Sequence, residues 1–138
     1  MLERFLEAYD AVLVLDTETT GISCRKDEII ELAVLKAGQD VNGLCELETM
    51  DEFVRLSEGR HLPDKIVELT GITERMLLDD GISKRQAAEM FSRMFGERTL
   101  IVAYNAQFDL CFLYYFLAQF GMADVLRGAK MLDALTVY

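Results

Sequence analysis

The chain has 138 residues, of which 51% are hydrophobic and 28% charged, with nine glycines and one proline. This composition is typical of one folded domain around a single core, and it excludes a disordered or fibrous chain. The 14 Lys and Arg against 24 Asp and Glu give a net charge of −10, which excludes binding of a phosphate backbone through bulk charge alone.

The first half of the chain predicts three strands and a short helix. Residues 11–15 form a continuous apolar run, which is typical of a strand buried on both faces of a sheet. A second strand is expected at 29–35, pairing as a hairpin with a weaker third strand at 43–49. Pro63 and Gly71 are expected to start and stop a helix, because proline favours the first turn and glycine the end.

The second half begins with an amphipathic helix. Ser83 and Gln86 have the spacing of a capping box, in which the serine oxygen accepts a hydrogen bond from the first turn. From Ala87 onward, apolar residues recur at i, i+4, i+7 and i+8 and form one stripe. A fourth strand is expected at 99–103.

A third helix is expected over 106–120, with Asn105 as its N-cap. Its sequence is apolar nearly all round, so we expect neighbouring elements to cover it on most sides. A fifth strand is expected at 130–134. This order of strands and helices indicates an α/β domain.

The cysteines give no sign of a disulfide framework or a zinc site. Cys24, Cys45 and Cys111 are an odd number without a CxxC pair, and His61 is the single histidine. We therefore expect reduced thiols in a cytoplasmic protein. The N-terminal ten residues lack a signal-peptide pattern, and the longest apolar stretch, at 110–118, is too short to span a bilayer, so no membrane association is expected.

Three acidic side chains occur where acids are unfavourable. Asp16 and Glu18 follow the apolar run at 11–15, and the period of a strand places both on one face. The first basic residue after them is Arg25. Asp109 lies in the first turn of the most apolar helix, where the helix dipole also favours an acid. Two divalent cations with oxygen ligands would resolve this repulsion, so the acids predict a two-metal site.

Other chemistries fit less well. The chain has no GxxxxGK[ST] phosphate loop, no GxSxG nucleophile elbow and no glycine-rich dinucleotide fingerprint. Residues 16–20 are similar to the DxDxT motif of haloacid-dehalogenase-type phosphatases, but Glu18 stands where that motif has its second aspartate.

Four segments together resemble a known family. They read LDTETTG at 15–21, DEIIELAV at 27–34, LTGIT at 69–73 and VAYNAQFD at 102–109. In this order they resemble the DEDD family of 3′–5′ exonucleases (the DnaQ-like, DEDDh-type branch), and in particular the proofreading epsilon subunit of bacterial DNA polymerase III. The resemblance covers residues 11 to 120.

The resemblance implies a ribonuclease H-like fold, a mixed sheet of strand order 3-2-1-4-5 with strand 2 antiparallel and with flanking helices. It also implies a site. By the family pattern the ligands of Mg²⁺ or Mn²⁺ are Asp16, Glu18 and Asp109. The residues that hold the 3′-terminal nucleotide are Thr19, Leu69, Thr70 and Phe108. An aromatic side chain beside a metal ligand can stack on a base, whereas core packing is the other interpretation for Phe108 and Leu69.

The family's third motif, HxAxxD or YxxxD, is missing from the chain. It supplies the general base and a fourth carboxylate. Asp133 is no substitute, because Gly128 stands where the motif has its histidine. We expect Asp133 to be a structural cap on a following helix. Residues 1–138 are accordingly expected to form a single exonuclease-like domain that lacks its C-terminal helical segment.

Two functions of different classes follow. The first is a metal-dependent 3′–5′ exonuclease on single-stranded DNA ends, which releases nucleoside monophosphates in proofreading or repair. Trimming of RNA 3′ ends is its variant, with DNA favoured over RNA. The second is a non-catalytic module that binds a polymerase or helicase. In either case this chain alone is expected to be a weak or inactive nuclease, and a second copy of it is a candidate partner because truncation would expose apolar surface.

Overall fold

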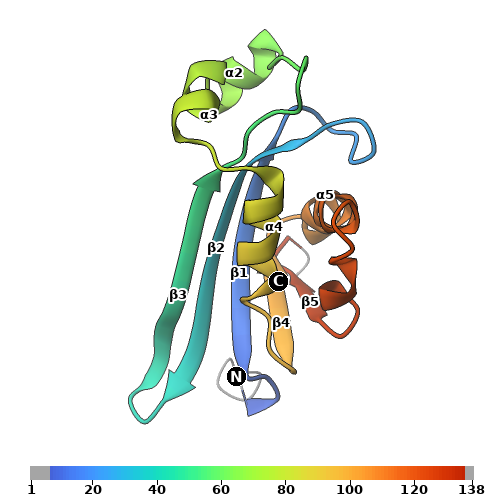
Figure 1. Ribbon diagram of the computed structural model, residues 1–138. Helices are drawn as coiled ribbons and strands as arrows, with labels where there is room; N and C mark the ends of the chain where they lie inside the picture. Colours follow the sequence, from blue (N-terminus) through green and yellow to red (C-terminus); the bar gives the residue numbers. More distant parts are fainter. Residues whose placement is uncertain (1–6, 136–138) are drawn as a thin grey trace.

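The computed structural model describes residues 7–135 and has a five-stranded mixed sheet at its centre (Figure 1). The strand order is β3-β2-β1-β4-β5. β2 is antiparallel to both β1 and β3, whereas β4 is parallel to β1 and to β5. The expected topology is therefore confirmed. The strands are β1 (Ala11–Thr19), β2 (Ile29–Asp40), β3 (Gly43–Phe53), β4 (Thr99–Ala103) and β5 (Lys130–Asp133).

The helices gather on one face and at one end of the sheet. They are α2 (Asp64–Thr70), α3 (Glu74–Asp80), α4 (Lys84–Ser92), α5 (Ala106–Ala118) and the 3₁₀ helix η1 (Ala123–Leu126). In Figure 1, α4 lies in front of the sheet, α5 lies to the right of α4, and α2 and α3 lie beyond the upper end of the sheet. Gly71 ends α2 in the left-handed conformation at φ 74°, as expected of a helix stop. The Ser83 hydroxyl accepts a hydrogen bond from the backbone N–H of Gln86 at 3.1 Å.

The main core lies between the sheet and the pair α4 and α5. Leu13 and Leu32 project from the sheet toward Phe91 of α4 and Leu113 of α5, and all four are fully buried. A smaller core around Ile30 and Leu77 attaches α2 and α3 to the upper end of the sheet. On the opposite sheet face the paired residues Val14 and Leu35 stay 43% and 37% exposed. No helix of the described part of the chain covers this face (Figure 1).

Helix α5 differs from its prediction in two ways. Asn105 has φ 57° and makes no side-chain cap, because its left-handed backbone turns the chain directly from β4 into the helix. The helix is also not covered on most sides. Leu113 and Leu117 are fully buried, whereas Tyr114 on the other side is 52% exposed, its ring packing edge-on to that of Tyr115. The outer face of α5 includes tyrosine side chains, whose hydroxyl groups can face water. The apolar composition of the helix therefore predicted more burial than the structure has.

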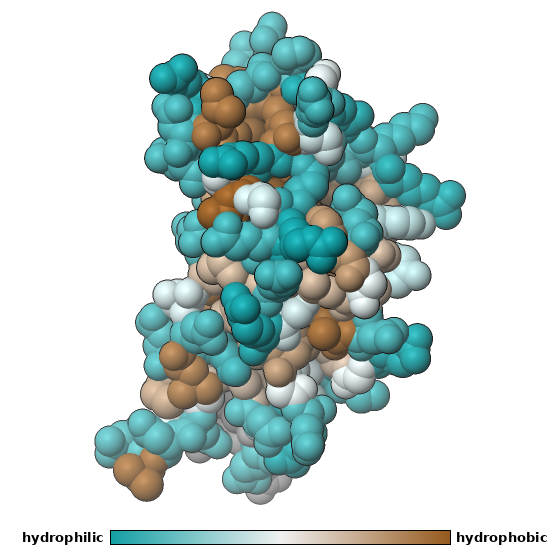
Figure 2. Space-filling model, viewed as in Figure 1, coloured by the Kyte–Doolittle hydropathy of each residue, from teal (hydrophilic) through white to brown (hydrophobic). Residues whose placement is uncertain are grey.

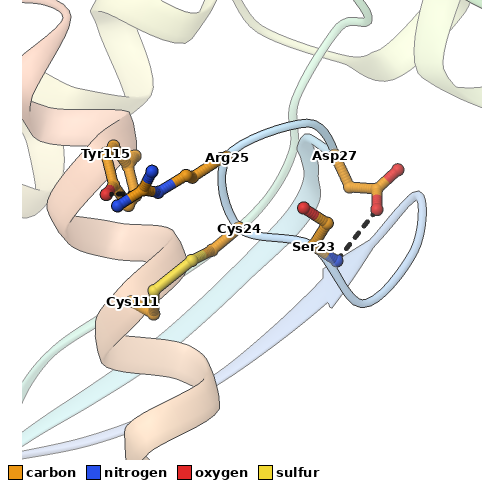
Figure 3. Close-up of a disulfide and its surroundings, with 6 residues drawn as sticks. All are labelled: Ser23, Cys24, Arg25, Asp27, Cys111 and Tyr115. Atoms are coloured by element: carbon orange, nitrogen blue, oxygen red, sulfur yellow. Dashed lines mark hydrogen bonds between the residues drawn. A yellow bond between two sulfur atoms is a disulfide. The ribbon is translucent and has the colours of Figure 1, made fainter.

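The expectation of reduced thiols is wrong for two cysteines. Cys24 and Cys111 form a disulfide with a Cα–Cα distance of 5.8 Å, and Cys45 is free. The two lie 87 residues apart in sequence, and they meet because the loop after β1 folds against α5 (Figure 3). Within residues 7–135 no helix is both long and apolar enough to cross a membrane.

Candidate active site

The two acids of β1 lie on the open face of the sheet. Asp16 is exposed, and Glu18 is half-buried. Their neighbours on β2 are Ala33 and Glu31, and directly opposed residues of antiparallel strands project from the same face. Burial raises the pKa of the Glu18 carboxyl above its usual range, and the charge of Asp16 raises it further. Both carboxylates therefore lie on one face of the sheet, as the period of the strand predicted.

Asp109 approaches β1 from the first turn of α5. The residue is only 4% exposed, and its carboxylate accepts a hydrogen bond from the Thr17 hydroxyl at 2.5 Å. Burial raises the pKa of Asp109 to about 6, and the charges of Asp16 and Glu18 add to this effect against the lowering by Thr17. Because Thr17 stands between Asp16 and Glu18 in β1, the hydrogen bond brings the third predicted acid to the strand that carries the other two.

The carboxylates of Asp16, Glu18 and Asp109 are not arranged around one common metal position. Across the described range 7–135, no group of three or more His, Cys, Asp or Glu side chains is arranged to hold a metal ion. The reason is geometric: Thr17 and Asp109 meet on the core face of β1, whereas Asp16 and Glu18 project from the open face. The donors nevertheless suit a hard divalent cation, since all are carboxylate oxygens and none forms a salt bridge within that range.

A fourth acid of this region was not predicted. Glu31 lies directly opposite Glu18. Burial raises the pKa of Glu31 to about 7, together with a hydrogen bond to Asp51 and the charges of Asp51, Glu18 and Asp16. The signal was available in the sequence, because Glu31 is the one acid inside the apolar run at 29–35. Pairing β2 with β1 would have placed it beside Glu18.

The turn after β1 is held by its own polar groups. Thr19 is buried and donates a hydrogen bond from its hydroxyl to the Gly21 carbonyl at 2.6 Å. The Thr20 hydroxyl donates to the Asp27 carboxylate at 3.1 Å. A Cβ atom on Gly21 would lie 2.5 Å from an oxygen of that same carboxylate, so a larger residue there would have to displace the Asp27 side chain. The Thr19 side chain is thus fixed inside the turn beside the β1 acids, with its hydroxyl already used.

The remaining predicted substrate residues lie in two helices. Phe108 is half-buried, and its ring is 4.9 Å from that of Phe112. Leu69 in α2 is 71% exposed, so it is not a core residue. The Thr70 hydroxyl donates to the Ile66 carbonyl at 2.7 Å and thereby helps to end α2. Figure 2 shows apolar surface over α2 and α3 at the upper end of the molecule, which is also the end where β1 finishes in Figure 1.

Asp133 makes structural contacts at the end of β5. Its carboxylate accepts hydrogen bonds from the backbone N–H groups of Asn105 at 3.1 Å and Leu135 at 2.9 Å. It therefore links the end of β5 to the turn between β4 and α5. The following helix that it was expected to cap would lie outside the described residues.

A mixed sheet of order 3-2-1-4-5, with two acids on its central strand and a buried acid at the start of α5, is the arrangement of a ribonuclease H-like domain. The family model of exonucleases, RNase_T, matches residues 13–138. The chain belongs to this exonuclease family, in its DEDD, DnaQ-like branch.

Similar proteins fall into two groups. The chain is 37% identical over 113 residues to a PolC-type DNA polymerase III of Halalkalibacterium halodurans, covering 81% of this chain and 7% of that protein. It is 38% identical over 103 residues to a PolC-type DNA polymerase III of Thermotoga petrophila, covering 73% of this chain and 7% of that protein. The chain thus spans a small part of these relatives.

Solved structures of Exonuclease I share the fold. Its apo structure superposes with a TM-score of 0.77 at 18% identity, over 91% of this chain and 29% of that chain. The Escherichia coli enzyme in complex with a dT13 oligonucleotide gives a TM-score of 0.72 at 18% identity, over 90% of this chain and 28% of that chain. At this identity the similarity concerns the fold.

Proposed function

We propose that this chain is the catalytic domain of a metal-dependent 3′–5′ exonuclease that shortens single-stranded DNA and releases nucleoside monophosphates, in proofreading or repair. One observation carries the proposal. Asp109 is buried, yet its carboxylate is held by Thr17 against the strand segment of Asp16 and Glu18, without a salt bridge among residues 7–135. Concentrating acids in this way is costly unless a cation balances them.

The proposed ligands of Mg²⁺ or Mn²⁺ are Asp16, Glu18 and Asp109. Bound at these oxygens, two such ions would neutralise the scissile phosphate and stabilise the attacking and leaving oxygens. This neutralisation would also let a chain of net charge −10 accept a polyanion.

Four residues are proposed to hold the terminal nucleotide. The exposed Leu69 offers an apolar surface to a base. Phe108 can stack on a base while its other side packs on the core. Because the hydroxyls of Thr19 and Thr70 are bonded to carbonyls of their own segments, these two residues are proposed to contribute backbone and methyl contacts.

Residues 1–138 are proposed to be one domain without its C-terminal helical segment. The 138 residues contain no third motif, and losing a general base costs roughly 10²–10⁴ in rate. We therefore expect slow cleavage by this chain alone.

DNA is proposed over RNA as substrate because the curated relatives reported above are DNA polymerases. A specific observation favours a second function, a non-catalytic module that binds a polymerase or helicase: no three acids of residues 7–135 are arranged to hold a metal ion.

A second copy of the chain is a further proposed partner, since the open sheet face exposes Val14 and Leu35.

The test combines metal binding with directional cleavage. Binding of Mn²⁺ is measured by calorimetry for the chain, for Asp109→Asn and for the matched surface variant Asp124→Asn, whose carboxylate is exposed. The same proteins are incubated with 5′-labelled single-stranded DNA, with its RNA counterpart, and with DNA blocked at the 3′ end.

The proposal expects Mn²⁺ binding that Asp109→Asn abolishes, and slow metal-dependent shortening from a free 3′ end that falls at least about a hundredfold in Asp109→Asn. Asp124→Asn should behave like the unchanged chain. Faster cleavage of RNA than of DNA would instead assign trimming of RNA 3′ ends as the function. If the chain does not bind Mn²⁺ and does not cleave nucleic acid, but binds a polymerase or helicase, it is the non-catalytic module.

A further inference from the structure

A cavity of about 280 Å³ is lined in part by the loop between β1 and β2. Its walls come from the loop at 24–29, the segment before α2, the start of α4 and one side of α5. Figure 3 shows that this loop lies against α5, where the Cys24–Cys111 disulfide joins the two and Arg25 reaches Tyr115. None of the three predicted metal ligands lines the cavity, but its wall includes α5, the helix that carries Asp109.

The cavity concentrates positive charge in an acidic chain. Its cationic residues are Arg25, Lys26, Arg60 and Lys84, and its acidic residues are Asp27 and Glu28, which gives 4 − 2 = +2. The chain as a whole carries −10. A local surplus of this sign attracts an anion.

Both acids of the cavity are already used by the protein. The Glu28 carboxylate pairs with Lys84 Nζ at 2.8 Å and with Arg60 Nε at 3.1 Å. The Asp27 carboxylate accepts a hydrogen bond from the Ser23 N–H at 3.0 Å and one from Thr20, so it is turned into the loop (Figure 3). These contacts fix the walls, and they leave the charges of the loop cations without compensation.

Arg25 and Lys26 are those loop cations. Neither forms a salt bridge with any residue of the described range. Arg25 is held in place by a hydrogen bond from its Nε to the Tyr115 hydroxyl at 3.0 Å, and its guanidinium carbon lies 5.8 Å from the centre of that ring. Its terminal nitrogens donate to no residue within 7–135, so the fork that matches a phosphate is oriented in advance.

We infer that this cavity binds a backbone phosphate of the single-stranded nucleic acid whose 3′ end lies at the acids; the inference rests on the proposed function. Tyr115 follows Asp109 by six residues on α5, which corresponds to about 9 Å along the helix axis. At about 3.4 Å per nucleotide of a stacked strand, the cavity serves the second or third phosphate from the end. The disulfide ties the loop of Arg25 and Lys26 to the helix of Asp109, so the spacing between the two sites is fixed.

The experiment measures binding of fluorescent oligo(dT) in Mn²⁺ over a series of NaCl concentrations, with phosphorothioate linkages at its 3′ end to prevent cleavage. The test variant is Arg25→Gln/Lys26→Gln. The control is Arg93→Gln/Arg127→Gln, which removes the same charge from two exposed arginines outside the cavity. Thermal unfolding and Mn²⁺ binding are measured for all three proteins, and the inference expects both to be unchanged.

For the test variant we expect about tenfold weaker binding at low salt and a slope of log K against log[NaCl] that is smaller by about 0.7, the value for one lost phosphate contact on a single strand. The control should keep the slope of the unchanged chain. Equal slopes for all three proteins, or equal losses in test and control, would overturn the inference.

A further arm distinguishes the source of the phosphate. Inorganic phosphate and thymidine monophosphate are tested as competitors. If millimolar inorganic phosphate binds the unchanged chain but not the test variant, while oligo(dT) binds both alike, the cavity serves free phosphate and the inference fails. The proposed function fails separately, through absence of Mn²⁺ binding and of cleavage, because neither measurement depends on Arg25 or Lys26.

Discussion

Because Asp109 of α5 is buried, we expect the metal-free protein to become more stable when this ionisable side chain is replaced. The pKa of Asp109 is raised from 3.8 to about 6, mainly by burial. At about 1.36 kcal/mol per pKa unit, holding this carboxylate ionised costs about 3 kcal/mol of folding free energy. Folding therefore favours the protonated carboxyl of Asp109. This contribution to the free energy of unfolding is fully present below pH 4, and it is lost as the pH rises through 6.

The perturbation is Asp109→Asn in the metal-free protein. The amide cannot ionise, yet its oxygen still accepts the hydrogen bond from Thr17. The variant should be more stable than the unchanged chain by up to about 3 kcal/mol at pH 7.5, and nearly equal to it at pH 4. For a domain of this size that gain corresponds to roughly 10 °C in Tm. Loss of metal binding would accompany it.

Urea unfolding in EDTA at the two pH values measures the effect, with Asp124→Asn as the exposed control. The reasoning is refuted if Asp109→Asn gains nothing at pH 7.5, or if its gain is the same at pH 4, since an effect independent of pH would come from amide packing. Adding Mg²⁺ should narrow the difference, because the ion stabilises only the chain that binds it.

Three further outcomes are expected. Replacing Cys24 and Cys111 by serine should lower the free energy of unfolding by up to about 4–5 kcal/mol, since their bond closes a loop across 87 residues; dithiothreitol should do the same to the unchanged chain and nothing to the variant. Phe91→Ala should cost about 3–5 kcal/mol in urea unfolding, because this ring is fully buried between α4 and the sheet. Glu31→Gln should raise Tm at pH 8.5 but not at pH 5, because the pKa of Glu31 is raised to about 7 and its ionisation is unfavourable above that value; an equal shift at both pH values would contradict this.

Apolar patterning predicted the sheet wherever a strand crosses the core. β4 was expected at 99–103 and has those bounds. β2 was expected to end at 35 but continues to Asp40, because its last residues pair with β3 outside the core. Such a segment is held by backbone hydrogen bonds, which leave no apolar signal in the sequence. Helix α3 was missed for a similar reason, since Leu77 is its one buried residue.

The candidate site was predicted residue by residue but not in its contacts. The acids Asp16, Glu18 and Asp109 follow from their sequence positions and from the family resemblance. The hydrogen bond from Thr17 to Asp109 joins residues 92 apart, and the disulfide joins Cys24 to a cysteine 87 residues away. Local propensity and periodicity carry no information about such pairs, because both depend on how α5 packs against the sheet.

The outer edge of β3 bears on how the molecule behaves when concentrated. Among residues 7–135, β3 pairs with β2 on one side only, so within that range its other side presents unpaired backbone groups along a strand of 11 residues. Its sequence carries four acids, Glu46, Glu48, Asp51 and Glu52. Two copies joined along this edge would oppose these charges directly, which disfavours strand-to-strand association and the aggregation that follows from it. Acid pH, which neutralises carboxylates, or high salt, which screens them, therefore removes the barrier to sheet extension.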